Sequence, residues 1–314
     1  MSEQKVCHKS KIGGQALIEG IMMRGIDYSS MAVRLPSGEI DLEKWSIKNG
    51  KNAPWYRKTP FVRGIFNLIT SMVEGYKCLS KSAEISAEAE EEELTDFEKK
   101  LDKIFGDKLM VIVTVFATIV GVALAVGLFI FLPTLLIWLL GRVIPISGVG
   151  KAVFEGALKI ALLIGYMALT SLLKDIRRTY EYHGAEHKTI ACYEGGEELT
   201  VENVKKYSRF HPRCGTSFLL IVMVVGIAVF AFVTLSNPVA RFALRIALMP
   251  VVVGVSYEII RIAGRYQNIV TKIISAPGMA LQRLTTREPD DGQIEVAITA
   301  LAAVIPENIE DDQW

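Results

Sequence analysis

The stretch 109-LMVIVTVFATIVGVALAVGLFIFLPTLLIWLL-140 decides the fold class of this chain. It is about 32 residues long and almost wholly apolar, whereas about 20 apolar residues in a helix suffice to cross the hydrocarbon core of a bilayer. Pro133, near its end, is expected to bend it. The sequence therefore predicts a membrane-spanning helix at residues 109–140.

Three further apolar runs, at residues 153–173, 217–235 and 238–260, have lengths near the same threshold. The composition agrees with this pattern, because 51% of the residues are hydrophobic and the mean hydropathy is +0.33, while 22% are charged. Apolar and polar segments must therefore be separated along the chain. We predict a mainly α fold: a polytopic helical membrane protein with about four transmembrane helices and a small cytosolic α+β region.

The distribution of positive charge predicts how these helices are oriented. The loop at residues 174–216 is rich in lysine and arginine, whereas the two loops on the opposite side offer little beyond Arg142 and Lys151. Because positively charged loops stay in the cytoplasm, this loop and both termini are expected there. The N-terminus, MSEQKVCHKSKIGG, has no apolar run after its lysines and lacks the pattern of a signal peptide. We expect a multi-pass protein of the cell (inner) membrane, with the lipid bilayer as a partner.

By this reasoning the chain divides into five regions. They are a cytosolic N-terminal region at 1–108, transmembrane helices at 109–173, a cytosolic loop at 174–216, further transmembrane helices at 217–260 and a cytosolic C-terminal region at 261–314. The first region is expected to hold a short β-hairpin around Gly38 and an amphipathic helix at 60–83. The acidic stretch at 87–100 is expected to be solvated, and Asp290 and Asp291 to begin a helix in the tail.

The string 179-TYEYHGAEHKTIACYEGG-196 is the most informative for chemistry. No breaker separates it from the preceding span until Gly195, so we expect that helix to continue into the cytosol. His183 and His187 then share one face, with Glu186 beside them. Two imidazoles one turn apart can bind Zn²⁺ or a similar divalent ion, a carboxylate can act as general base, and H-x-x-E-H matches the inverzincin pattern. The alternative is a pair of interfacial histidines bonded to lipid headgroups.

The string 210-FHPRCGT-216 runs into the third predicted span, so that His211 and Cys214 can reach the headgroup level. Unpaired amides and the helix dipole lower a thiol pKa there, and either side chain could complete a tetrahedral metal site. Arg213 and the same amides could instead cradle a phosphate of a phosphorylated or membrane-associated substrate. A purely structural interpretation makes this string a turn, with Thr216 capping the helix.

Two more acids complete the candidate site residues. Glu258 shares a helical stripe with Arg261 and Arg265, so it could bind a metal or orient a ligand, while the arginines hold an anion or anchor the helix to lipid. Glu19 and Arg24 lie in 13-GGQALIEGIMMRG-25, whose glycines permit unusual backbone angles.

Charge and cysteine usage limit the remaining possibilities. A net charge of +1 and a pI near 7.6 give no field that would attract nucleic acid, so no such partner is expected. The cysteines have no C-x-x-C spacing and lie in segments expected in the cytosol, which favours free thiols or a metal ligand over disulfides. They are Cys7, Cys78, Cys192 and Cys214.

Four strings, GGQALIEGIMMRG, YHGAEHKTI, HPRCGTSFL and TTREPDDGQIEVAI, together resemble the YqhQ-like family of bacterial membrane proteins, nearly from end to end of the chain. That family is functionally uncharacterised and is described as a predicted metal-dependent enzyme. The resemblance therefore implies topology more than activity. Carried over residue by residue, it directs attention to Gly14, Gln15, Glu19, Arg24, His183, Glu186, His187, Lys188, His211, Arg213, Cys214, Arg287, Glu288, Asp290 and Asp291.

These features predict a cytosol-facing, membrane-embedded, metal-dependent hydrolase acting on an amphiphilic or membrane-associated substrate. Its cofactor would be a divalent metal, most simply zinc, and its candidate ligands are His183, His187, His211, Cys214 and Glu258. The candidate catalytic residues are Glu186 as general base, Glu19 as a second acid and Arg213 as a stabiliser of negative charge.

The sequence is also compatible with two other classes of protein. A non-enzymatic scaffold or assembly factor would recruit cytosolic partners and use its histidines structurally. A transporter ranks third, because the spans contain few polar residues at mid-membrane and show no inverted repeat. A homo-oligomer is compatible with each of these.

Overall fold

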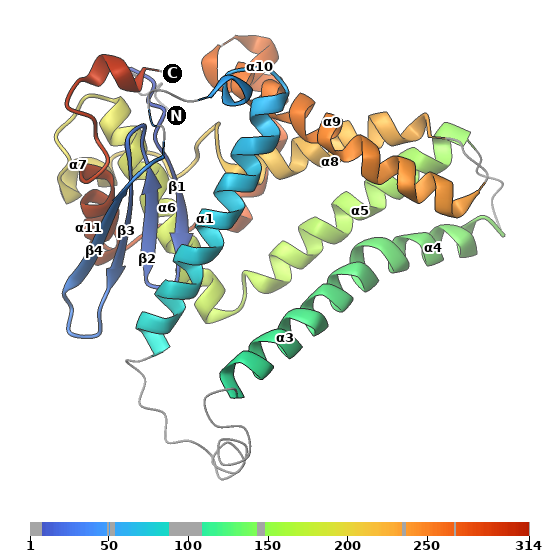
Figure 1. Ribbon diagram of the computed structural model, residues 1–314, viewed down its shortest axis with the longest axis horizontal. Helices are drawn as coiled ribbons and strands as arrows, with labels where there is room; N and C mark the ends of the chain where they lie inside the picture. Colours follow the sequence, from blue (N-terminus) through green and yellow to red (C-terminus); the bar gives the residue numbers. More distant parts are fainter. Residues whose placement is uncertain are drawn as a thin grey trace.

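The computed structural model describes residues 8–48, 50, 54–87, 109–142, 148–233, 237–266 and 268–313. Within them, a four-stranded sheet and the helices that cover it lie to one side of a group of long apolar helices (Figure 1). Cys7 and all but the first residue of the acidic stretch at 87–100 lie outside the described residues.

The sheet is an antiparallel meander in the order β1-β2-β3-β4. Its strands are β1 (Gly13–Leu17), β2 (Gly20–Arg24), β3 (Tyr28–Arg34) and β4 (Ile40–Ser46). The hairpin predicted around Gly38 is confirmed as β3–β4, and Gly38 has the positive φ of 89° that favours glycine. The β1–β2 hairpin was not predicted, and it closes over a two-residue turn in which Glu19 has φ of 51°.

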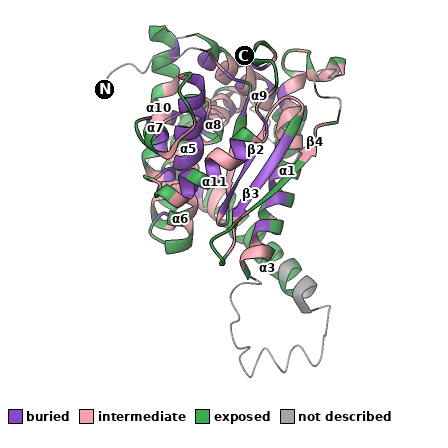
Figure 2. Cartoon of the chain, turned by 90° about the vertical axis from the view of Figure 1, so that its left-hand side faces the viewer, coloured by how far each residue is buried: buried purple, intermediate pink, exposed green. Residues whose placement is uncertain are grey.

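Strands β2 and β3 are buried on both faces, which explains why β2 escaped prediction. Successive side chains of a strand point to opposite faces. Ile21 and Met23 join a core with helices α6 (Lys174–Glu194) and α11 (Asp291–Ala302), while Met22 joins a second core against α1 (Val62–Ala87). Figure 2 shows the resulting burial along β2 and β3. Because apolar residues fill both faces, the alternation that marks a half-buried strand is missing.

The remaining helices form the apolar part of the molecule and its connections. They are α3 (Leu109–Val126), a π-helical turn at Gly127–Phe131, α4 (Leu132–Leu140), α5 (Gly148–Thr170), α7 (Val201–Lys205), α8 (Gly215–Ala231), α9 (Pro238–Arg265) and α10 (Ile269–Thr285). The π-helical turn directly precedes the turn that contains Pro133, which lacks the N–H of a regular helix. Short 3₁₀ turns occur at Trp55–Arg57 and Ile309–Asp312.

Three helices in the described part of the chain are long and apolar enough to cross a membrane. They are Val115–Leu140, Gly150–Thr170 and Phe242–Arg265. The third predicted span corresponds to α8, which has 17 residues and falls short of the length used for the others. Membrane association is therefore supported, but the expected count of about four spans is not confirmed.

The prediction that one helix continues from the second span through the H-x-x-E-H string is wrong. Helix α5 ends at Thr170, and Leu173 has an extended backbone with ψ of 134° before α6 begins at Lys174. No proline or glycine marks this break, so no breaker residue predicts it. The break separates the apolar helix from α6, which packs against β1 and α11. The predicted end of that helix before Gly195 is confirmed.

Two other local predictions are confirmed. The amphipathic helix expected at 60–83 is α1, which presents Cys78 to the sheet and keeps Met72 and Tyr76 exposed. Asp290 is the N-cap of α11: its side chain accepts a hydrogen bond from the backbone N–H of Gln293, and Gln293 bonds back to Asp290.

We predict that Gly64→Ala loosens the contact between α1 and α9. A Cβ at Gly64 would lie 2.5 Å from the Cβ of Tyr257, so one helix must shift. We expect a loss of about 1–3 kcal/mol in unfolding free energy, seen as a lower midpoint of thermal unfolding in detergent. The control is Gly165→Ala in α5, where an added Cβ meets no atom within 4 Å. Equal midpoints for the two variants would contradict this packing.

Candidate metal centre

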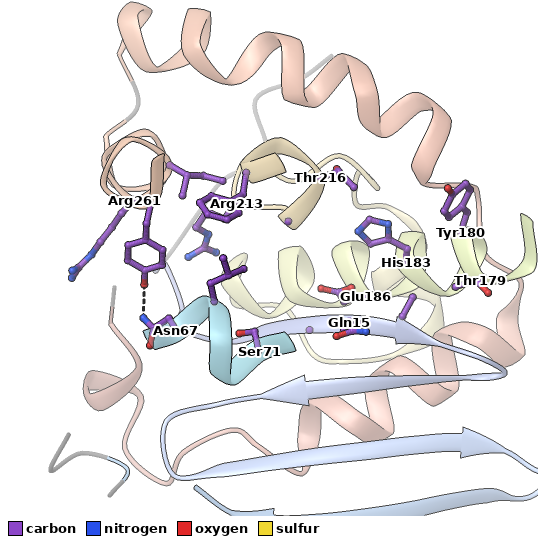
Figure 3. Close-up of a pocket in the computed structure, with 17 residues that line it drawn as sticks. Gln15, Asn67, Ser71, Thr179, Tyr180, His183, Glu186, Arg213, Thr216 and Arg261 are labelled. Atoms are coloured by element: carbon purple, nitrogen blue, oxygen red, sulfur yellow. Dashed lines mark hydrogen bonds between the residues drawn. The ribbon is translucent and has the colours of Figure 1, made fainter. Parts of the chain in front are cut away.

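Three potential metal ligands converge where α6 meets the start of α8. His183 and His187 lie one turn apart on α6, and Cys214 is the N-cap residue of α8. One ligand atom from each lies within 4.8 Å of the other two. His183 is half-buried, while His187 and Cys214 are buried. Figure 3 shows His183 beside Glu186, with Gln15 of β1 on the other side of that carboxylate.

Backbone carbonyls orient both imidazoles. Nδ1 of His183 lies 2.8 Å from the carbonyl oxygen of Thr285, and Nδ1 of His187 lies 2.6 Å from that of Arg209. A carbonyl oxygen only accepts, so each Nδ1 donates, and a ring in its neutral form would present the lone pair of Nε2. Nε2 of His183 lies 3.3 Å from Sγ of Cys214. Metal-binding histidines typically donate a hydrogen bond from the ring nitrogen that does not bind the metal, as Nδ1 does here.

The spacing and chemistry of these atoms suit a divalent ion. Tetrahedral zinc with nitrogen and thiolate ligands requires about 3.3–3.6 Å between neighbouring ligand atoms. The distance from Nε2 of His183 to Sγ of Cys214 is at the lower end of that range, and the other pairs lie within 4.8 Å, so the ligand atoms would draw closer around a bound ion. A set of two imidazoles and one thiolate leaves a fourth position open, as in catalytic zinc sites.

The charges around Cys214 favour its thiolate form. Burial opposes the anion, but the imidazoles of His187 and His183 outweigh it and hold the pKa of the thiol well below its usual value. Sγ also lies 3.2 Å from the hydroxyl oxygen of Thr216. In turn, burial opposes the protonation of His183, but Cys214 and Glu186 raise the pKa of that imidazole to about 9.

Glu186 lies beside the two histidines and is only 5% exposed. Burial raises the pKa of its carboxyl group, while His187 and His183 and the backbone N–H of Gly14 act in the opposite direction. Gly14 is required by this contact, since a Cβ there would lie 2.9 Å from both Cγ and Cδ of Glu186. Strand β1 therefore positions the carboxylate that α6 supplies.

His211, a candidate ligand, has other partners. Its backbone N–H donates to the side chain of Gln282 at 2.8 Å, and the Gln282 amide donates back to its carbonyl oxygen at 2.8 Å. Nε2 of His211 lies 3.9 Å from a carboxylate oxygen of Glu194. Burial and the Arg213 guanidinium outweigh Glu194 and lower the pKa of His211 to about 4. His211 is thus a neutral neighbour of His187, with ring centroids 5.5 Å apart.

Arg213 and Glu194 form a buried ion pair at the edge of the centre. The Arg213 guanidinium donates to Glu194, and also to the carbonyl oxygen of Ser10 at 2.6 Å. Glu194 accepts from the backbone N–H of Ser10 at 2.7 Å. Burial alone would raise the pKa of Glu194, but His211 and Arg213 lower it to about 2. Arg213 lines the cavities described below, with its charge directed towards Glu194.

The other two predicted acids lie outside the three-ligand group. Glu258 accepts from the Arg63 guanidinium, with Nε at 2.8 Å, and from the backbone N–H of Phe61 at 3.1 Å. Glu19, in the β1–β2 turn, accepts from Arg178 and from the hydroxyl of Tyr182 at 3.2 Å. Both carboxylates join elements of the fold: α9 to α1, and the sheet to α6.

Two adjoining cavities open onto the centre. One, of about 590 Å³, has His183 and Glu186 in its wall, together with residues of β1, α1, α8 and α9. The other, of about 380 Å³, contacts all three potential ligands and Glu186. The side chains Leu68, Phe218 and Ile260 give the larger cavity much of its apolar wall. A ligand in that cavity would thus meet apolar surface together with polar groups, among them His183 and Glu186 in one part and Asn67 and Arg261 in another.

Comparison with known proteins agrees with the four strings that suggested a family. Residues 59–307 match the family described as "Protein of unknown function (DUF1385)". The chain belongs to the DUF1385 family. It is similar to "Uncharacterized protein YqhQ" of Bacillus subtilis (strain 168), at 36% identity over 300 residues, which is 95% of this chain and 92% of that protein. No solved structure matches it.

Several residues that shape the centre of this DUF1385 protein were missed in the sequence. Glu194 could have been found, because it lies seven residues after His187 and therefore on the same helical face. Gln282 and the carbonyl groups of Thr285 and Arg209 gave no signal, because backbone acceptors and a single amide have no distinctive sequence pattern. Gly184 is also required: a Cβ there would lie 2.0 Å from the carbonyl oxygen of Arg287.

We predict that Cys214 and Cys78 differ in how their alkylation depends on pH. In chelator-treated protein, Cys214 should react with iodoacetamide at a rate that changes little between pH 6 and 8, because its lowered pKa leaves it as thiolate throughout. Burial raises the pKa of Cys78 to about 11, so its rate should rise about tenfold per pH unit over the same range. Mass spectrometry of the labelled peptides measures both. Parallel pH profiles would contradict the proposed charge arrangement.

Proposed function

We propose that this protein is a membrane-embedded, metal-dependent hydrolase with its site at the cytosolic surface. One observation supports it above all: His183, His187 and Cys214 bring a ligand atom each within 4.8 Å of the others, beside a buried glutamate. A purely structural role for the two histidines would not require their Nε2 atoms to converge with a thiol. Two independent backbone acceptors maintain that aim.

The residues around the ion would have separate roles. His183, His187 and Cys214 would hold it, and when bound it would act as a Lewis acid and lower the pKa of a water molecule. Glu186 would accept a proton from the attacking water and deliver it to the leaving group. Its burial favours a raised pKa, which suits a group that must both take up and release a proton near neutral pH.

The position of the larger cavity supports an amphiphilic or membrane-associated substrate. Phe218 lies in the first turn of α8, and Tyr257 and Ile260 lie in the last turns of α9. The cavity therefore lies where α8 begins and α9 ends, and in a membrane-embedded protein this position would be near the lipid headgroups. Lysines and arginines concentrate in the polar segment that supplies α6, which by the positive-inside rule faces the cytosol.

One feature favours a second candidate, a thiol hydrolase or acyltransferase without metal. Sγ of Cys214 lies 3.3 Å from Nε2 of His183 at the N-terminus of α8, which is also an arrangement for a nucleophile and its base. In that mechanism Cys214→Ser and His183→Ala would abolish activity, chelators would have no effect, and the purified protein would contain no stoichiometric metal.

The metal assignment predicts which variants lose the ion. Elemental analysis of protein purified without chelator should find about one zinc or similar divalent ion per chain, and much less in His183→Ala, His187→Ala and Cys214→Ala. His211→Ala and Glu258→Gln should keep it, because those side chains bind Glu194 and Arg63 instead. Metal-free wild type would contradict the proposal, and loss of metal only in His211→Ala would contradict the ligand set.

The role of Glu186 can be tested apart from metal binding. Glu186→Gln should retain the ion and lose about 10²–10⁴-fold in hydrolysis of a short-chain nitrophenyl ester. Gly14→Ala should also lose activity, because its methyl group would collide with the Glu186 side chain, whereas Gly13→Ala should not, because its methyl group meets open space. Full activity of metal-loaded Glu186→Gln would exclude this residue as the base.

A further inference from the structure

Strand β1 has only one neighbour in the sheet. The order β1-β2-β3-β4 places it at an edge, and β2 pairs with it along its whole length from Gly13 to Leu17. The other side of an edge strand presents backbone N–H and C=O groups that can pair with another extended chain. In β1 that side faces the candidate metal centre.

The geometry identifies which backbone groups are available. The backbone N–H of Gly14 donates a hydrogen bond to the Glu186 carboxylate, so this N–H faces away from β2. In an antiparallel strand the direction alternates, and Ala16, two residues on, must face the same way. Apart from the ladder to β2 and the Glu186 contact, no hydrogen bond involves Gly14 or Ala16 among the residues that the structure describes.

The backbone N–H and C=O groups of Ala16 lie in the wall of the larger cavity. Gly14, Gln15 and Ala16 line it together with His183 and Glu186. In Figure 3 the strand that contains Gln15 runs alongside α6, with Glu186 between them. A chain paired with Ala16 and extended along β1 would therefore pass Glu186 and His183. The volume of about 590 Å³ lies within the usual range for ligand sites.

The chemistry of this wall favours a peptide over a lipid. An acyl chain would cover the N–H and C=O of Ala16 without satisfying them, and a buried unpaired backbone group is costly. An extended peptide satisfies them by strand addition and sends alternate side chains towards apolar surface such as Leu68 and Phe218. Its amide would then lie beside the general base.

We infer that the substrate is an extended segment of a membrane-associated polypeptide, bound by backbone pairing to β1; this rests on the proposed function. The reaction is hydrolysis of a peptide bond. The water oxygen bonds to the carbonyl carbon, the C–N bond breaks, and Glu186 transfers the water proton to the departing amine. Specificity would come from strand pairing and from the apolar wall.

The direct test uses the full chain, loaded with zinc, in detergent micelles. A proteome-derived peptide library is incubated with it, and new termini are identified by mass spectrometry. The best-cleaved peptide is then resynthesised with one backbone N-methyl group at each position in turn. Methylation should lower kcat/KM by at least about tenfold at alternate positions near the cleaved bond and by less than about threefold at the positions between. An effect without this alternation, or a library without cleavage, would overturn the inference.

A variant of β1 provides a second test. Ala16→Pro removes the outward N–H and leaves the ladder to β2 intact. It should lower kcat/KM for the same peptide by at least about tenfold, with unchanged zinc content and unfolding temperature. Gly13→Ala is the matched control on the same strand. Wild-type cleavage by Ala16→Pro would overturn strand pairing.

A lipid substrate separates failure of this inference from failure of the proposed function. The same protein is incubated with vesicles of phosphatidylglycerol and phosphatidylethanolamine. Hydrolysis of these lipids without peptide cleavage would contradict the peptide substrate and leave a metal-dependent hydrolase. Hydrolysis of neither substrate, by protein that retains no zinc, would contradict both.

Discussion

The candidate centre depends on the hydrogen bonds between two imidazole N–H groups and two backbone carbonyls. The acceptors come from Thr285 at the end of α10 and from Arg209 before α8, whereas His183 and His187 both belong to α6. The bonds fix ring orientation and tautomer, so that both Nε2 atoms face Cys214. The helix supplies the imidazoles, but segments more than 20 residues away in the chain decide where they point.

This arrangement makes the sheet and the apolar helices parts of one site. Gly14 of β1 contacts the Glu186 carboxylate, the start of α8 supplies Cys214, and the end of α9 closes the cavity with Tyr257. The Arg213–Glu194 pair also joins the segment at Ser10 to α6 and α8. A site between polar elements and the ends of apolar helices would suit the membrane-associated substrate of the proposed hydrolase.

Local patterns in the sequence predicted part of this architecture. The β3–β4 hairpin, α1, the N-cap at Asp290 and the shared face of His183 and His187 follow from short-range periodicity and capping. The break at Leu173 was not predicted, because no proline or glycine marks it. The β1–β2 hairpin was not predicted either, because its apolar residues point to both faces of the sheet. The sequence also left open whether His211 or Cys214 completes the site, with Glu258 as a further ligand or an orienting group. Which of them brings a ligand atom close to both His183 and His187 depends on tertiary packing between distant segments, which spacing alone does not encode.

X-ray absorption at the zinc edge of the purified, metal-loaded protein tests the account most directly. It should show one sulfur at about 2.3 Å and two imidazole nitrogens at about 2.0–2.1 Å from zinc, with an oxygen or nitrogen atom in the fourth position. The sulfur should disappear in Cys214→Ala. A coordination shell without sulfur in the wild type, or one composed only of oxygen atoms, would contradict a centre built from His183, His187 and Cys214.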